Sequence, residues 1–359
     1  MALTKVDPTV VDDQVFGRRN LIINGDMRIA QRGTSATTLS TTSEVFSADR
    51  FRMEQGSVTA NNGTIEVATD APSGTGFTTS FKVTGGSSVS YNSTGFAAIN
   101  YRGEGSDFNQ VLHGTSSAKT VTISFWVKSS VTGTYSLNHT KYDGSTERYN
   151  VSEYTISQAN TWEYKKVNVA GDTSVSASDW IRLYWQLGGD SGHKTATAGI
   201  WINGDGTKRA TSSQPDMIST NGATFFLTGV QLELGSQATP FEFRSIGEEL
   251  TLCERYYQRI GNDEGTNTHL MVGSAEGAGT YVVSRALRTR MRAVPTFALI
   301  GTVAGFTASA GVVTVNSVST RCTSDIACVS AAVSGTATAG QAAVLYDNSG
   351  GIIELAAEL

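Results

Sequence analysis

Four side chains in this sequence suit the recognition of sugars. Trp180, Arg182 and Tyr184 alternate with the apolar residues of a strand-like segment, so they share the face that does not turn toward a core. Trp126 occupies a similar place in an earlier segment. Flat aromatic rings pack against the apolar faces of pyranoses, while polar neighbours bind the hydroxyls. These four residues are the candidate glycan contacts; the alternative for each is that a loop or a neighbouring subunit covers it.

A catalytic constellation is not evident in the same sequence. The histidines are scattered, and no two of them have the spacing of metal ligands: they are His113, His139, His193 and His269. There is no G-x-S-x-G motif, and sequence alone cannot assign the carboxylates to a glycosidase geometry. The long repeat of a β-solenoid is also absent. We therefore expect no enzymatic activity.

The charge of the chain argues against two classes of partner. Only 16% of the residues are charged and the formal net charge is −5, so nothing favours binding to nucleic acid or to an anionic membrane. The sequence contains no run of about 18 apolar residues, the length needed to cross a bilayer. The first residues also lack the pattern of a secretory signal. A local cluster from Arg285 to Arg292 suits a solvated strand edge, or else an acidic glycan.

The elements that would position these side chains are strands. Thirty-eight glycines and only five prolines, among many Thr, Ser and Asn residues, favour short strands and tight turns. Residues 121–127 and 180–187 alternate clearly, and residues 225–234 are typical of a closing strand in which Phe226, Val230 and Leu232 face inward. At least eight such strands precede the first helical pattern, which predicts an all-β, jelly-roll β-sandwich over residues 20–244.

A helix and a smaller unit follow the predicted sandwich. Ser245 and Glu248 have the S-x-x-E form of a capping box, which predicts a linking α-helix over residues 245–261. Residues 262–359 then read as a small C-terminal β-domain with few large side chains, so we expect it to pack against copies of itself. In that domain Cys322 and Cys328 could pair or remain free.

Three runs of residues carry a resemblance to a known class of protein. They are N-L-I-I-N-G-D at 20–26, the closing strand and its continuation at 225–244, and G-E-E-L-T-L-C-E-R-Y-Y-Q at 247–258. Over roughly residues 18–260 the chain resembles bacteriophage tail fibres or receptor-binding proteins with a jelly-roll domain like a carbohydrate-binding module. The resemblance implies a virion adhesin, a homotrimer on the exterior of the particle, that attaches it to host-surface polysaccharide.

The same resemblance leaves several points open. Residues 1–19 would be an arm that attaches the fibre to other virion proteins of the tail or capsid, or simply a disordered terminus. The rivals to an adhesin are a structural virion component, such as a capsid knob or tail adaptor, and a polysaccharide-degrading tailspike. No cofactor is expected apart from a structural calcium ion, which such modules often carry near their first and last strands. Asp26 and Glu233 are oxygen ligands at those places, although Asp26 could instead satisfy its own turn.

Overall fold

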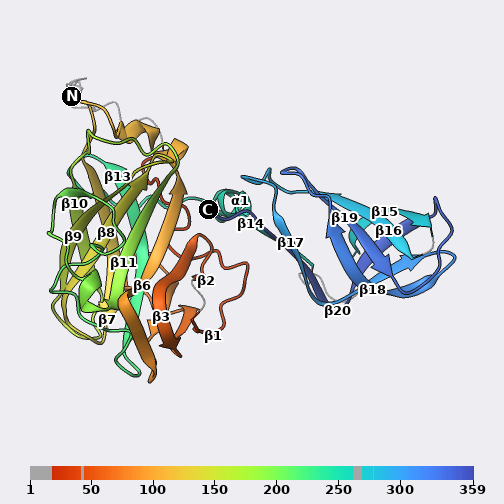
Figure 1. The fold of residues 1–359 in the computed structure, drawn as a ribbon, viewed down its shortest axis with the longest axis horizontal. Helices are drawn as coiled ribbons and strands as arrows, with labels where there is room; N and C mark the ends of the chain where they lie inside the picture. Colours follow the sequence, from red (N-terminus) through yellow and green to blue (C-terminus); the bar gives the residue numbers. More distant parts are fainter. Residues whose placement is uncertain (1–17, 42–43, 262–268, 278) are drawn as a thin grey trace, which may run out of the picture. The chain divides into compact units, whose positions relative to one another are not determined.

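The protein is described here from a computed structural model that places residues 18–41, 44–261, 269–277 and 279–359. It divides into two compact units, Met1–Arg244 and Ser245–Leu359, which Figure 1 shows with most of their strands labelled. All of the predicted N-terminal arm except its last two residues, Arg18 and Arg19, lies outside the described residues.

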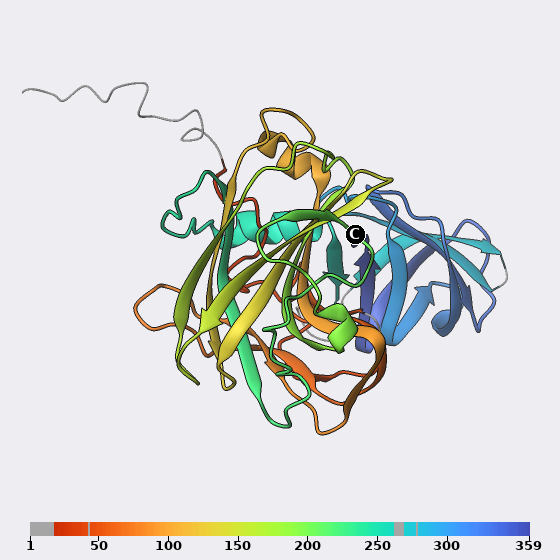
Figure 2. The same cartoon turned by 60° about the vertical axis from the view of Figure 1, so that its left-hand side comes forward.

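The first unit consists of two antiparallel sheets, whose strands are drawn from a second direction in Figure 2. Sheet A has the order β1-β4-β5-β13-β7-β10, and sheet B has the order β12-β9-β8-β11-β6-β3-β2. The strands are β1 (Thr37–Thr38), β2 (Glu44–Phe46), β3 (Phe51–Asn61), β4 (Thr64–Ala68), β5 (Ser80–Thr84), β6 (Val89–Glu104), β7 (Val121–Ser129), β8 (Gly133–Tyr142), β9 (Glu147–Ile156), β10 (Glu163–Val169), β11 (Trp180–Gly189), β12 (Trp201–Asn203) and β13 (Thr224–Leu234). Two 3-10 helices, η1 (Gly105–Val111) and η2 (Ser191–His193), lie between strands.

The core of this unit lies between the two sheets. Ile123 and Phe125 of β7 and Leu183 and Trp185 of β11 are fully buried in one cluster. Because successive side chains of a strand point to opposite faces, this alternation leaves the intervening residues on the outer faces. Each large apolar side chain buried in this way contributes roughly 1.5–3 kcal/mol. The prediction of an all-β fold built on a jelly-roll β-sandwich is confirmed.

One detail of the closing strand differs from the expectation. Phe225 and Leu227 face the core, whereas Phe226 lies on the outer face against the ammonium group of Lys128. The register between β13 and β7 shifts between Thr228 and Gln231, so Val230 and Leu232 return to the core after this bulge. A bulge changes which parity faces inward, and the sequence pattern alone assigned Phe226 to the wrong side.

The second unit begins with the predicted helix, but the helix is shorter than expected. In α1 (Ile246–Glu254) the Ser245 side chain accepts a hydrogen bond from the Glu248 backbone N–H, as the capping box predicts. The helix does not continue to residue 261, because β14 (Tyr257–Ile260) pairs with a strand from the end of the chain. Pairing in a sheet gives these backbone groups partners that a helix would otherwise supply.

The rest of the second unit is a closed ring of six strands. These are β15 (His269–Gly277), β16 (Thr280–Ala286), β17 (Thr296–Thr307), β18 (Gly311–Thr320), β19 (Ile326–Val333) and β20 (Ala342–Ala356). They follow the order β20-β15-β16-β19-β18-β17, and β17 pairs back onto β20. Val and Ala supply much of its core, and Cys322 and Cys328 carry free thiols. None of the helices in the described part of the chain has the length and the hydropathy of a membrane-spanning segment.

The arginine cluster of the second unit has partners within that unit. Arg288 forms an ion pair of 3.0 Å with Glu254, and Arg290 lies 3.8 Å from Asp325. Arg292 donates from Nε to the Ala357 carbonyl. These contacts suit a structural role for the cluster, as on a solvated strand edge.

Candidate functional site

The structure separates the four predicted glycan contacts. Trp180, Arg182 and Tyr184 do share the outer face of sheet B, but Tyr184 is fully buried. Its hydroxyl donates to Glu54 Oε1 at 3.0 Å and accepts from Arg182 Nη1 at 2.9 Å. Burial leaves no surface for a ligand, so the prediction that Tyr184 contacts glycan is wrong.

Trp180 is only partly buried, yet its ring already has three neighbours, one of them the Arg102 guanidinium 5.7 Å from its centroid. The ring stacks on Tyr142 with centroids 5.0 Å apart, and the Arg182 guanidinium lies 3.9 Å from its centroid. A sugar would have to displace one of these groups to reach a face of the indole. The outer face of sheet B near Trp180 therefore offers less free ring surface for a glycan than the sequence pattern predicted.

Trp126 lies in a different place, in an open pocket of about 640 Å³ on the outer face of sheet A. Aromatic rings dominate its lining, with hydroxyl groups between them and no charged side chain. The lining residues are Thr75, Phe77, Ser124, Trp126, Tyr164, Gly229, Ala238, Thr239, Pro240, Phe241 and Phe243. We take this aromatic pocket as the candidate functional site.

Strand register sets the first half of the aromatic pocket. Trp126 of β7 is directly opposite Tyr164 of β10, and their ring centroids are 5.4 Å apart. Direct cross-strand neighbours on one face are within reach of each other's rings. Tyr164 is 43% exposed, so this pair offers accessible ring surface.

The bulge of β13 makes room for the second half. Gly229 has φ +61°, and a Cβ atom there would lie 2.6 Å from Cζ of Phe77 and 3.1 Å from Cδ1 of Trp126. Glycine adopts this left-handed conformation without steric cost, and its lack of a side chain leaves space for the Phe77 ring. Phe77 in turn contacts Phe241 and Phe243, with centroids 4.9 and 5.1 Å away.

Two buried polar residues of β13 hold the wall formed by residues 238–243. Glu233 accepts hydrogen bonds from the backbone N–H and the hydroxyl of Thr239, at 2.9 and 2.6 Å. Gln231 accepts from the Glu242 backbone N–H at 2.9 Å and donates to Glu233. Because both side chains are buried, these bonds fix the chain that carries Phe241 and Phe243.

The carboxylates predicted to bind calcium have separate partners. Asp26 forms an ion pair with Arg28, and Glu233 holds Thr239 as described above. Among the described residues there is no group of three or more His, Cys, Asp or Glu side chains placed to hold a metal ion. Ca²⁺ takes six to eight oxygen ligands, and no such carboxylate-rich set surrounds either residue in the described part of the chain.

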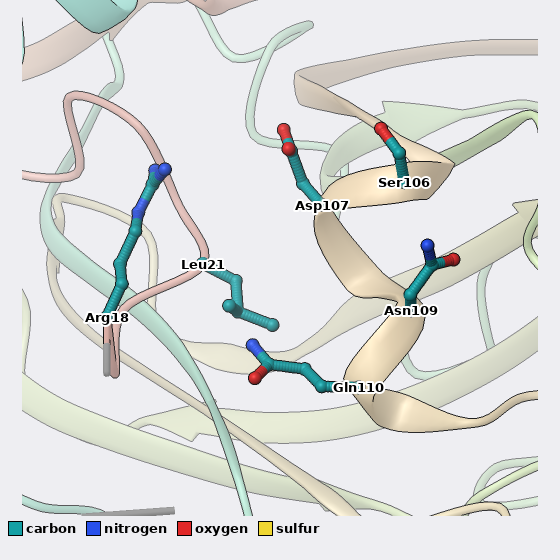
Figure 3. Close-up of a pocket in the computed structure, with 6 residues that line it drawn as sticks. All are labelled: Arg18, Leu21, Ser106, Asp107, Asn109 and Gln110. Carbon is teal, nitrogen blue, oxygen red and sulfur yellow. The ribbon is translucent and has the colours of Figure 1, made fainter. Parts of the chain in front are cut away.

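A second pocket, of about 370 Å³, is polar (Figure 3). It lies between the segment that carries Arg18 and Leu21 and the exposed face of η1, whose Gln110 points toward Leu21. Ser106, Asp107 and Asn109 complete its lining. Because none of these residues is aromatic, the pocket offers hydrogen bonds but no ring on which a sugar could stack.

Two buried histidines lie close together away from these pockets. The rings of His113 and His139 are 5.8 Å apart, and each contacts Trp201. Burial, assisted by the Lys141 ammonium, lowers the pKa of His113 to about 4. Burial also lowers the pKa of His139 well below its ordinary value, and His113 and Lys141 act in the same direction. The pair is therefore neutral at pH 7.

Comparison with known proteins gives structural matches only. No family model and no curated protein matches the sequence. The enzymatically active domain of tailspike protein 4 from bacteriophage CBA120 matches with a TM-score of 0.31 and 12% identity; the match covers 60% of this chain and 21% of that one. A xylan-binding CBM22 domain from Paenibacillus barcinonensis matches with a TM-score of 0.30 and 15% identity. That match covers 52% of this chain and 92% of the CBM22 domain.

A family 61 carbohydrate-binding module in complex with β-1,4-galactotriose gives a similar match, with a TM-score of 0.29 and 12% identity over 61% of this chain and 100% of that one. The match to the tailspike domain covers only about a fifth of the length of that domain's chain.

Proposed function

We propose that this chain is an adhesin that binds polysaccharide through the aromatic pocket of sheet A. The observation that carries the proposal is the combination of exposed rings and hydroxyls in one open pocket with no charged lining. Trp126 and Tyr164 would stack against the apolar face of a pyranose, as aromatic side chains do with flat apolar surfaces. Ligand sites are commonly apolar hollows with a few well-placed polar groups.

The hydroxyls of the pocket suit the hydroxyls of a sugar. Thr239 donates its proton to Glu233, and Thr75 donates its proton to the Pro72 carbonyl. The Thr239 oxygen also accepts from Gln231 Nε2 at 3.3 Å, which leaves it one lone pair for a sugar hydroxyl, whereas the Thr75 oxygen keeps two. The pocket would thus accept hydrogen bonds from a sugar while the rings exclude water from its apolar face.

We assign the adhesin to a phage virion, as a tail fibre or receptor-binding protein that attaches the particle to host-surface polysaccharide. This part of the proposal rests on the resemblance of residues 20–26, 225–244 and 247–258 to such proteins. A homotrimer, with residues 1–19 joined to other virion proteins, belongs to the same proposal. The chain would bind polysaccharide without cleaving it and without a cofactor.

A glycan array probed with the full chain tests the proposal. Wild type should bind a defined set of neutral glycans, and Trp126→Ala and Tyr164→Ala should each lose that binding. Trp180→Ala is the matched control: it removes an aromatic ring from sheet B and should leave the binding intact. Absence of binding to any glycan, with correctly folded protein, would favour a purely structural virion component. Release of reducing ends from a bound polysaccharide would instead indicate a degrading tailspike.

A further inference from the structure

The chemistry of the aromatic pocket restricts the sugar more closely than the proposed function does. None of its lining residues is charged, so a carboxylate, phosphate or ammonium group on a ligand would lose water without gaining an ionic partner. Sialic acids, uronic acids and amino sugars with a free amine are therefore poor ligands for this pocket. The ligand that fits is neutral.

Three of the lining residues form a cluster of phenylalanine rings, which we call the phenylalanine corner. The rings of Phe77, Phe241 and Phe243 contact one another, with centroids between 4.8 and 5.1 Å apart. Phenylalanine offers neither donor nor acceptor, so a sugar hydroxyl pressed into this corner would give up its hydrogen bonds to water. A methyl group there would instead gain by leaving water.

The remaining part of the pocket provides a different surface. Trp126 and Tyr164 form the stacking pair, and the hydroxyl oxygens of Thr75 and Thr239 are placed as acceptors because their protons are already donated within the protein. The pocket therefore combines a ring-stacking pair, two hydroxyl acceptors and the phenylalanine corner. A pyranose with hydroxyls on one part and an apolar substituent on another matches both surfaces.

We propose, building on the glycan-binding function, that the aromatic pocket selects a neutral pyranose that carries a methyl group, and that the phenylalanine corner receives this methyl. Two kinds of sugar supply it: a 6-deoxyhexose, through C6, and an N-acetylated hexose, through its acetyl group. Trp126 and Tyr164 bind the ring in either case, and Phe243 supplies selectivity. Phe243 is 48% exposed, so its truncation tests selectivity with little cost to the core.

The experiment compares sugars that differ in one group, each presented on a polyvalent protein conjugate to the immobilised full chain. The pairs are L-fucose against L-galactose, L-rhamnose against L-mannose, and N-acetylglucosamine against glucose. At least one methyl-bearing member should bind about fourfold or more tightly than its partner, as burial of one methyl group predicts. A preference in the first two pairs identifies the deoxy methyl, and a preference in the third identifies the acetyl methyl.

Variants separate this inference from the function beneath it. Phe243→Ala should remove the preference within a pair, whereas Trp126→Ala should weaken both members alike. Equal binding of both members in every pair, or a preference that survives in Phe243→Ala, would overturn the inference and leave glycan binding standing. If no conjugate binds and the wild-type chain also fails on polysaccharide, both the inference and the proposed function are wrong.

Discussion

The buried histidines predict that acid destabilises the first unit. His113 and His193 are almost fully buried, and burial is the largest cause that lowers their pKa values, to about 4 and about 3. Lys141 adds to the effect at His113, and Arg209 adds to it at His193. The ordinary value of 6.5 applies in the unfolded chain. The unfolded state therefore takes up protons below pH 6.5 while the folded state remains neutral.

The sign and size of the effect follow from this difference. Lowered folded pKa values stabilise the protein fully above pH 6.5, and that stability is lost as the pH falls toward the folded values. Between pH 7 and pH 5 each of the two histidines lowers the free energy of unfolding by about 2 kcal/mol. This is about 1.4 kcal/mol per pH unit over the roughly 1.5 pH units below 6.5. His139, whose pKa burial also lowers, acts in the same direction. The sum is a large share of a typical domain stability of about 5–15 kcal/mol.

Urea unfolding followed by tryptophan fluorescence measures this loss directly. All five tryptophans lie in the first unit, so the signal reports on that unit alone. His139→Phe should reduce the pH dependence, because it removes a group whose pKa is lowered on folding. Among the described residues neither ring nitrogen of His139 has a hydrogen-bond partner, so the substitution strands none there. His269→Phe is the control, since His269 is exposed and lies in the second unit. A free energy of unfolding that is equal at pH 7 and pH 5 would refute the reasoning.

Four further predictions follow: two concern the pocket wall, one the metal and one self-association. Gly229→Ala should weaken glycan binding and lower the free energy of unfolding by about 1–3 kcal/mol, because φ is +61° and the new Cβ would clash with Phe77. An unchanged melting temperature in calorimetry would contradict this. Glu233→Ala should loosen Thr239 and weaken glycan binding several-fold. Millimolar calcium or EDTA should leave the wild-type melting temperature unchanged, and a rise with calcium would indicate a metal site after all. Phe306 and Val312, opposite each other and 44% and 64% exposed, should contribute to the homotrimer; replacing both with Ser should lower the mass seen by light scattering, and an unchanged mass would exclude this surface.

The sandwich could be predicted from sequence because its strands alternate cleanly. Segments such as 121–127 and 180–187 place one apolar residue in two toward the core, and the structure follows that period. The inward-facing residues of the closing strand could not be predicted in the same way. The bulge at Gly229 changes which alternate residues face the core. The end of the helix could not be predicted from the local sequence either, because Tyr257–Ile260 pairs with residues almost a hundred positions later in the chain.

The candidate site was predictable only in part. Trp126 was identified from its parity, but Phe77 and Phe241 come from chain segments outside regular strands, and no local period places them beside it. The alternation of Phe241 and Phe243 around Glu242 was the one signal of a shared face. Tyr184 was wrongly predicted to be accessible. Its position in the strand does point it to the outer face, but other parts of the unit cover that face.

The most direct test of the central claim is a calorimetric titration with an oligosaccharide selected on the array. Trp126→Ala should raise Kd at least tenfold, corresponding to about 1.4 kcal/mol or more, while Trp180→Ala should change it by less than twofold. Equal affinities for wild type and Trp126→Ala, or a loss confined to Trp180→Ala, would contradict a binding site at the aromatic pocket.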